Sequence, residues 1–342
     1  MVLVIIIAFI SLIGLLVLHE FGHFILAKRF GVKVEEFGIG YPPRIIGKKI
    51  GETLYSLNLL PFGAFVRIHG EEEDAKDPRS FTSKPIWQRA LILIGGVLTF
   101  WIISFLILSF IPTGVGIIAV QDGSPADLSG LITGDVMEEI IIDGVGYPLF
   151  TIKDVQLRIN ENRGEEITLV VQRGEERVSI LARPRLSPPP QEGALGIALG
   201  YAASQRNYPL YQAPYRGFLR TAEFTFSAME GWYLALSNIT QGKPSGARLM
   251  GPIGIFDMFT QVAELGSSYF LLFLALISIY IALFNILPIP VVDGGRLLFL
   301  GIEALRGKPF DRKIEQNVNA LFFFILIALM IWVTIQDVIH IF

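Results

Sequence analysis

Long runs of apolar residues alternate with polar stretches along the chain. Four runs approach or exceed the roughly 20 residues that a helix needs to cross the hydrocarbon core of a bilayer. They predict a polytopic α-helical membrane protein with four transmembrane helices, at residues 1–28, 90–111, 269–287 and 319–338. The alternative for the first run is a cleaved signal peptide, but no basic region precedes this run and no A-x-A-like cleavage site follows it.

The distribution of Lys and Arg predicts the orientation of these helices. The loop at 29–89 and the segment at 288–318 are rich in both residues, whereas the chain before Leu18 and after Trp332 contains neither. Basic loops tend to stay on the cytoplasmic side of a membrane. We therefore expect both termini and the long segment 113–268 on the outer side of the lipid bilayer.

The first part of the outer segment, residues 113–200, has the pattern of a β module. Short β-rich runs are separated by Gly, Asp and Pro turns. These runs lie at 116–120, 136–142, 167–172 and 177–182, and 196–200 is a candidate for closing the sheet. A small β domain inserted between the second and third apolar runs is the prediction.

The second part of the outer segment, residues 201–268, is predicted to be a connecting region. Residues 215–240 show a helical period with many aromatic side chains, and Gly231, Gly242 and Pro244 are expected to interrupt or end the helix. Two arrangements are open. The helix is either amphipathic and lies on the outer membrane surface, or it packs on the β module.

The first apolar run ends in a motif that carries chemistry, His19-Glu20-Phe21-Gly22-His23. Residues four apart share one face of a helix, so both imidazoles can reach one metal ion, with Glu20 beside them as a general base. Ionisable groups next to an apolar span are costly and usually functional. The alternative is that these polar residues only mark the membrane surface.

A third metal ligand is needed, because catalytic zinc usually has three protein ligands. The third apolar run ends in a stretch with Asn285, Pro288, Pro290 and Asp293. The prolines must break the helix, and broken backbone at membrane depth is tolerated where protein or a water-filled cavity covers it. Asp293 lies just beyond the break, toward the same inner side as His19. The alternative is that Asp293 caps the following helix.

These motifs together resemble the site-2 protease family of intramembrane zinc metalloproteases, in particular the bacterial RseP-like members with a single PDZ domain. Gly251-Pro-Ile-Gly254 is also similar to that family. The resemblance implies that His19, His23 and Asp293 bind Zn²⁺. It further implies that Glu20 is the catalytic base and that Asn285 helps to hold the substrate.

The resemblance also implies a location and partners. The protein would lie in a bacterial cytoplasmic (inner) membrane, with its active site toward the cytoplasmic half. Its substrates would be single-pass transmembrane proteins, such as anti-sigma factors or remnant signal peptides. Residues 113–200, with Gly123-Ser-Pro-Ala126, resemble a circularly permuted PDZ domain, which would bind substrate C-termini or a regulatory partner.

Two positions depart from the family pattern. Gly95-Gly96-Val-Leu-Thr99 stands where the family often has Gly-Pro and an Asn, so no role for an asparagine carries over. Val292-Asp293-Gly294 replaces the commoner Leu-Asp-Gly, a conservative change that keeps the ligand.

The cytoplasmic loop contains a predicted hairpin at about 54–68, with two β runs around a turn at 61–63. It resembles the family's membrane-associated β-hairpin, whose edge would pair with an extended substrate, and Gly63 and Phe65 are the candidate substrate-binding residues. The alternative is an ordinary hairpin that packs on its own domain. Just beyond it, His69 and the acidic run 71–74 form either a second metal site or a solvated loop.

Composition narrows the choice of function. The net charge of −3 argues against nucleic acid as the main partner, and the absence of Cys removes thiolate ligands and a Cys nucleophile. A different class of function is a membrane-anchored PDZ scaffold with a structural or inactive zinc site. A metal transporter would need a polar path across the bilayer, for which the second and fourth runs offer almost no ionisable residues.

Overall fold

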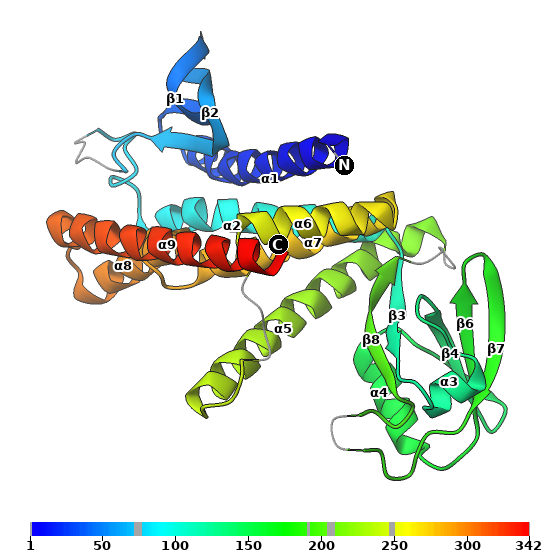
Figure 1. Cartoon of the computed structure of the whole chain (residues 1–342). Helices are drawn as coiled ribbons and strands as arrows, with labels where there is room; N and C mark the ends of the chain where they lie inside the picture. The colour runs from blue at the N-terminus through cyan, green and yellow to red at the C-terminus, as the bar shows by residue number, and fades with distance from the viewer. Residues whose placement is uncertain (1, 72–76, 190–191, 204–208, 246–249, 342) are drawn as a thin grey trace. The chain divides into compact units, whose positions relative to one another are not determined.

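The computed structural model describes residues 2–71, 77–189, 192–203, 209–245 and 250–341 (Figure 1). They fall into two compact units. Unit 1 comprises Met1–Ile107 and Pro214–Phe342, and unit 2 comprises Leu108–Ala213. Of the acidic run at 71–74, the described residues include only Glu71, and parts of the predicted regions at 201–268 and 29–89 also lie outside the described residues.

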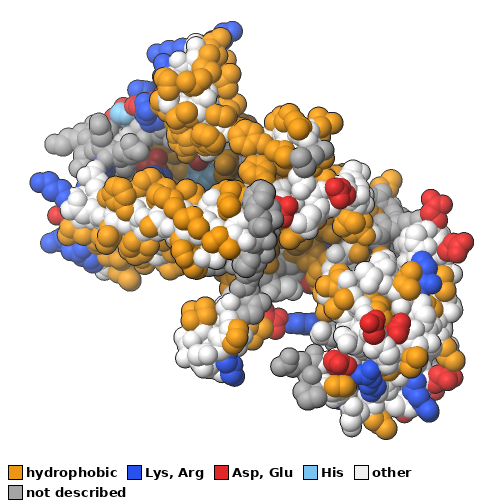
Figure 2. All heavy atoms as spheres, viewed as in Figure 1, with side chains coloured by type: hydrophobic (Ala, Val, Ile, Leu, Met, Phe, Trp, Pro, Cys, Tyr) orange, Lys and Arg blue, Asp and Glu red, His pale blue; other side chains and the backbone are white. Residues whose placement is uncertain are grey.

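Unit 1 is built mainly from helices. They are α1 (Val2–Arg29), α2 (Ile86–Phe110), α5 (Ala213–Thr240), α6 (Pro252–Glu264), α7 (Ser267–Ile286), α8 (Asp293–Arg306) and α9 (Arg312–Ile341). Within the described residues, four are long and apolar enough to cross a membrane, namely α1, α2, α7 and α9. On the face shown in Figure 2, apolar side chains cover much of α1 and α9, whereas charged side chains are spread over unit 2. The prediction of four apolar helices and a separate β region is confirmed.

The helices α1 and α2 approach each other closely because small residues face one another. A Cβ added to Gly22 would overlap the backbone of Gly95, and a Cβ on Gly95 would overlap Leu26 of α1. A buried apolar cluster also joins α1, α2, α6 and α7. Its fully buried members include Ala8, Phe100 and Phe259. Small residues at helix crossings are typical of membrane proteins, where close packing replaces the hydrophobic effect between helices.

The loop between α1 and α2 forms a sheet that is larger than predicted. It consists of β1 (Val34–Ile50) and β2 (Thr53–Ile68), joined at Gly51 and Glu52. Both strands bend, so residues 36–39 of β1 pair with 64–67 on one side and with 54–57 on the other. The predicted turn at 61–63 is therefore wrong as a hairpin turn. The two halves of β2 do not pair with each other, because β1 lies between them.

Unit 2 is a six-stranded antiparallel sheet with short helices. Its elements are β3 (Thr113–Val120), α3 (Pro125–Ser129), β4 (Val136–Ile142), β5 (Val145–Pro148), α4 (Ile152–Glu161), β6 (Ile167–Arg173), β7 (Glu176–Ala182), β8 (Ile197–Ala203) and the 3-10 turn η1 (Leu210–Gln212). The strand order is β7-β6-β4-β3-β8, and β5 pairs with β4. All the predicted β runs form strands, and 196–200 closes the sheet beside β3 as expected.

The helix predicted at 215–240 is α5, and it runs without a break. Gly231 lies inside it, so the expected interruption at that residue is wrong. Gly242 lies in the turn after the helix ends at Thr240. Trp101 of α2 donates a hydrogen bond to Thr225 of α5 at 3.2 Å, which ties α5 to the apolar helices of unit 1.

Candidate metal centre

The two histidines of the sequence motif lie one turn apart on the buried face of α1. His19 is 8% exposed and His23 is 5% exposed. Their Nε2 atoms are 3.3 Å apart, and their rings meet edge to face. As the sequence predicts, the i, i+4 spacing places both imidazoles on one face of α1 and directs them to one point.

The third candidate ligand arrives from a break between two helices. The chain leaves helical geometry after Ile286, and α8 begins at Asp293. The residue in the N-cap position is Val292, so Asp293 is not the N-cap of α8. Its carboxylate points to α1 instead, with Oδ2 3.4 Å from Nε2 of His19 and 3.4 Å from Nε2 of His23.

Gly294 and Gly295 make this position of Asp293 possible. A Cβ on Gly294 would overlap the carbonyl oxygen of Leu287, and a Cβ on Gly295 would overlap that of Ile289. The start of α8 can fold back against the broken segment only because both side chains are hydrogen. The glycines thus bring the carboxylate to the histidines.

The three donor atoms fit a metal ion of the size and preference of zinc. Tetrahedral ligands at the usual Zn–N distance stand about 3.3 Å from one another, close to the 3.3 and 3.4 Å separations found here. Within the part of the chain that the structure describes, His19, His23 and Asp293 are the one group of this kind. Asp293 Oδ2 is buried there without a hydrogen-bond donor. A cation between the three side chains would satisfy it.

Three residues of α2 orient the histidines, and no sequence motif had indicated that they belong to the site. The Nδ1 atom of His23 is 2.8 Å from the carbonyl oxygen of Ile92, which leaves Nε2 for a metal. The ring of Phe100 stacks on that of His19 at 4.8 Å. A Cβ on Gly96 would overlap both imidazoles. The motif Gly95-Gly96 was visible in the sequence, but only the structure relates it to the metal ligands.

The candidate base Glu20 is partly buried and contacts the sheet. The backbone N–H of Val66 in β2 donates to Glu20 Oε2 at 3.1 Å. This N–H lies on the side of segment 64–68 that faces away from β1. A backbone amide carries no side-chain signal, so the sequence could not indicate this contact.

The three candidate substrate-binding residues have different local settings. Asn285 of α7 is half-buried and donates to the carbonyl of Ile281 at 2.9 Å. Gly63 has a φ of +150°, and a side chain there would meet the ring of Tyr41. The ring of Phe65 stacks on Tyr41 at 6.2 Å. Both residues lie in β2, Gly63 at its bend and Phe65 in the segment 64–68 that follows.

Comparison with known proteins shows the family to which the chain is similar. The model of Peptidase family M50 matches residues 7–329. A Clostridium perfringens protein, named as a candidate zinc metalloprotease, is 33% identical over 98% of both chains. Zinc metalloprotease RasP of Oceanobacillus iheyensis is 28% identical over 97% of this chain and 98% of its own. The regulator of sigma-W protease RasP of Bacillus subtilis is 28% identical over the same shares. The chain therefore belongs to Peptidase family M50, the site-2 protease family, and is a zinc metalloprotease.

Proposed function

We propose that this protease hydrolyses peptide bonds within or near the transmembrane segments of single-pass membrane proteins. The observation that carries the proposal is the position of the His19, His23 and Asp293 cluster. It is buried among helices that are apolar enough to span a bilayer. A hydrolytic centre in that setting meets substrates that are themselves in the membrane.

The ligands of the proposed Zn²⁺ are His19, His23 and Asp293. When bound, the ion would supply Lewis-acid chemistry toward the scissile carbonyl and the attacking water. Glu20 accepts the proton from that water and returns it to the leaving amine. His23 is held in one tautomer by the carbonyl of Ile92, and Phe100 limits rotation of the His19 ring. Asn285 is assigned to the substrate as a hydrogen-bond donor.

The substrate is expected to bind in an extended form. A membrane helix hides each carbonyl in an internal hydrogen bond, so a protease must first unwind it. Residues 64–68 have β1 on one side, and the amide of Val66 on the other side faces Glu20. A substrate strand that pairs along this open edge would lie beside the base. Gly63 and Phe65, at the start of the edge, are the proposed substrate contacts.

The orientation and location follow the charge of the loops. The basic segments 29–89 and 288–318 favour the cytoplasmic side of a bacterial inner membrane. The active site then lies toward the cytoplasmic half, with both termini and the β module outside. Unit 2 is assigned as a PDZ domain, supported by its antiparallel sheet with two short helices. Its role would be to bind substrate C-termini or a regulatory partner.

Substrates of the anti-sigma factor class are part of the proposal. The Bacillus subtilis relative is named a regulator of sigma-W protease, which connects a similar chain with the control of a sigma factor. Remnant signal peptides are the second class, because they too are short single-pass segments. The scaffold alternative predicts instead that Glu20 and Asp293 are dispensable while unit 2 is essential.

The test is cleavage of a model single-pass substrate by the purified protein in detergent or lipid, alongside metal analysis. We expect wild type to contain about one zinc ion and to cleave the substrate. Glu20→Gln should retain the zinc and lose cleavage, because the amide cannot accept the proton. A fully active Glu20→Gln protein would exclude Glu20 as the base. A wild type that contains zinc but does not cleave, with intact unit 2 binding, would favour the scaffold.

A further inference from the structure

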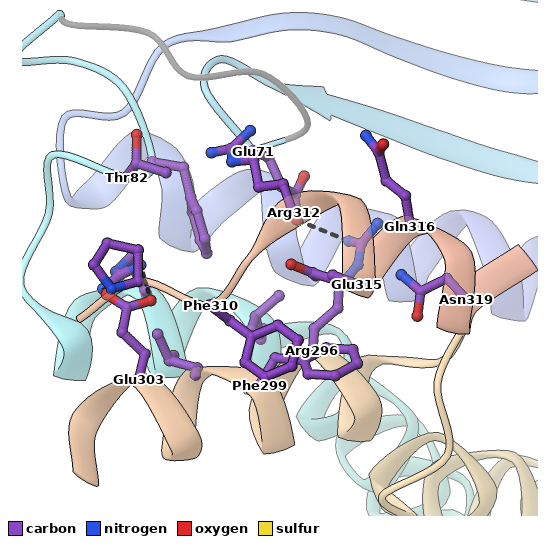
Figure 3. A pocket seen from close by; sticks show the side chains of 15 residues that line it. Glu71, Thr82, Arg296, Phe299, Glu303, Phe310, Arg312, Glu315, Gln316 and Asn319 are labelled. Carbon is purple, nitrogen blue, oxygen red and sulfur yellow. Dashed lines mark hydrogen bonds and ion pairs between the residues drawn. The ribbon is translucent and has the colours of Figure 1, made fainter. Parts of the chain in front are cut away.

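Two ion pairs hold the helix that carries Asp293, one toward each of its ends. Arg296 lies 2.7 Å from Glu71. Glu303 accepts two hydrogen bonds from Arg89 of α2, at 2.5 and 3.1 Å. All four side chains line one cavity of about 430 Å³. Figure 3 labels Glu71, Arg296 and Glu303 around it, together with Phe299 and Phe310. The helix α8 is therefore tied by charge to two different parts of unit 1.

Glu71 is fixed to the end of β2. Its N–H donates to the carbonyl of Ile68, the last residue of the strand, at 3.2 Å. Between them, the N–H of His69 donates to Lys33 at 3.0 Å, and its carbonyl accepts from Phe81 at 2.8 Å. Because this connection is short and bonded on both sides, a displacement of segment 64–68 must also displace Glu71.

Arg296 is fixed in the same way to the third metal ligand. It follows Asp293 by three residues in the first turn of α8, so both side chains move with one helix end. That helix end is packed against the broken segment through Gly294 and Gly295. A shift of Arg296 toward or away from the sheet would therefore move the Asp293 carboxylate against the histidines.

The contacts form a closed circuit around the site. α1 is joined to β2 by the 3.1 Å bond between Glu20 and Val66. β2 is joined to α8 by Glu71 and Arg296, and α8 returns to α1 where Asp293 meets His19 and His23. The Glu71–Arg296 pair is a charged link between the sheet and the helix of the third ligand, beside the apolar cluster that contains Val34, Ile68 and Leu300.

We propose that the Glu71–Arg296 ion pair is a positioning contact, which sets the register between a substrate strand on β2 and the metal-ligand cluster. This inference rests on the proposed function, since it assumes that the edge at 64–68 holds the substrate. The pair assigns a role to Glu71, an acidic residue for which the sequence offered only a second metal site or a solvated loop. Misplacement of reacting groups by about 1 Å can cost roughly a hundredfold in rate.

The two ion pairs differ in a way that separates positioning from stability. The Arg296 side chain is 41% exposed and that of Glu71 is 12% exposed, so solvent screens the Arg296 end of this pair. Arg89 and Glu303 are 9% and 18% exposed, and breaking a pair with both partners buried leaves a charge uncompensated. Loss of Glu71–Arg296 should therefore alter cleavage with a smaller loss of stability than loss of Arg89–Glu303.

The experiment compares five forms of the full-length protein on one model substrate. They are wild type, Glu71→Gln, Arg296→Gln, the charge-swapped double variant E71R/R296E, and Glu161→Gln as a control in an exposed pair of α4. The measurements are kcat, KM, zinc content, thermal unfolding, and the cleavage position by mass spectrometry. A sixth form, Glu303→Gln, breaks the other ion pair of the same helix and serves as the matched comparison.

We expect Glu71→Gln and Arg296→Gln to lose about ten- to a hundredfold in kcat, with neighbouring peptide bonds now also cut. Zinc content should stay near wild type, the unfolding temperature should fall less than in Glu303→Gln, and the swapped variant should regain a single cleavage position. Single variants that cut at one position with the wild-type kcat would overturn the inference. So would a loss that is matched by unfolding or zinc loss and is not rescued by the swap. A wild type without cleavage would instead refute the proposed function itself.

Discussion

Two buried aspartates in unit 1 show two ways to compensate a carboxylate beside apolar helices. Asp293, at the start of α8, is 8% exposed and faces two imidazoles. Asp337, near the end of α9, is 1% exposed, and its Oδ2 accepts the N–H groups of Gly251 and Gly254 at 2.8 Å each. These amides belong to the first turn of α6, where the helix dipole also favours a negative charge.

The difference concerns what each carboxylate requires from its neighbours. Asp293 Oδ2 has no hydrogen-bond donor among the described residues, and two imidazoles that can hold a cation face it. Asp337 accepts two fixed amide N–H groups on Oδ2, while its Oδ1 is also buried without a hydrogen-bond partner in the described part of the chain. A buried carboxylate is therefore not evidence of chemistry by itself, and the groups aimed at it decide. Substitutions that keep the shape but remove the charge should separate the two cases.

The largest effect is expected for Asp293→Asn. The amide is a poor zinc ligand and cannot neutralise the ion, so zinc content and cleavage should fall together. Because metal-assisted catalysis contributes several kcal/mol, cleavage should decrease by about 10³-fold or more. Zinc analysis and cleavage of a model substrate measure both effects, with thermal unfolding as the check that the fold persists. An Asp293→Asn protein with full zinc content would remove Asp293 from the ligand set.

The next effect is expected for Gly96→Ala, which tests the metal centre without touching a ligand. A Cβ at this position would overlap the rings of His19 and His23, so the imidazoles must move. Zinc affinity and cleavage should each fall by about 10- to 100-fold, as for other residues that orient metal ligands. Gly301→Ala in α8 is the matched control, because no atom lies within 4 Å of the added Cβ. Equal zinc affinity in both variants would contradict the packing argument.

How far the sequence predicts the metal centre depends on whether a contact has a side-chain signature. His19 and His23 are predictable because their spacing follows from the helical period alone. Asp293 is predictable because Pro288, Pro290 and two glycines mark a break in an apolar run. Two other contacts cannot be predicted from the sequence, namely that of Glu20 with the Val66 amide and that of Asp337 with two amides. Every residue except Pro supplies a backbone N–H, so such a contact has no side-chain signature. Only Gly251 and Gly254 mark the second contact, as positions where a side chain would meet Asp337.

The sheet of unit 1 shows a second limit of prediction. Residues 34–50 contain Gly38, Gly40, Pro42 and Pro43, which disfavour a regular strand, and the segment lacks a clean alternation of polar and apolar residues. It nevertheless forms β1, because residues 36–39 are paired on both sides by β2. Such pairing between distant segments overrides local preference. In unit 2, by contrast, strands with strong local patterns appeared where the sequence indicated them.

The third prediction concerns stability rather than chemistry. Asp337→Ala leaves the N–H groups of Gly251 and Gly254 buried without an acceptor, which should cost about 2–4 kcal/mol in the free energy of unfolding. Asp337→Asn keeps one acceptor oxygen and should cost less than about 1.5 kcal/mol. Both proteins should retain their zinc. Chemical denaturation in micelles measures the cost, and an Asn variant that loses its zinc would mean that Asp337 acts on the metal centre after all.

The smallest effect is expected where the buried polar group carries no charge. The Ser278 hydroxyl of α7 is fully buried and donates to the carbonyl of Phe100 at 2.9 Å, next to the ring that stacks on His19. That carbonyl also accepts from Ser104 at 3.1 Å, so Ser278→Ala leaves it with a partner. Hydrogen bonds of this kind between membrane helices contribute about 0.6 kcal/mol on average. We therefore expect Ser278→Ala to shift the unfolding free energy by no more than about 1 kcal/mol and to leave zinc content unchanged. If Ser278→Ala lost as much unfolding free energy as Asp337→Ala, burial and not charge would set the cost of removing a buried polar group.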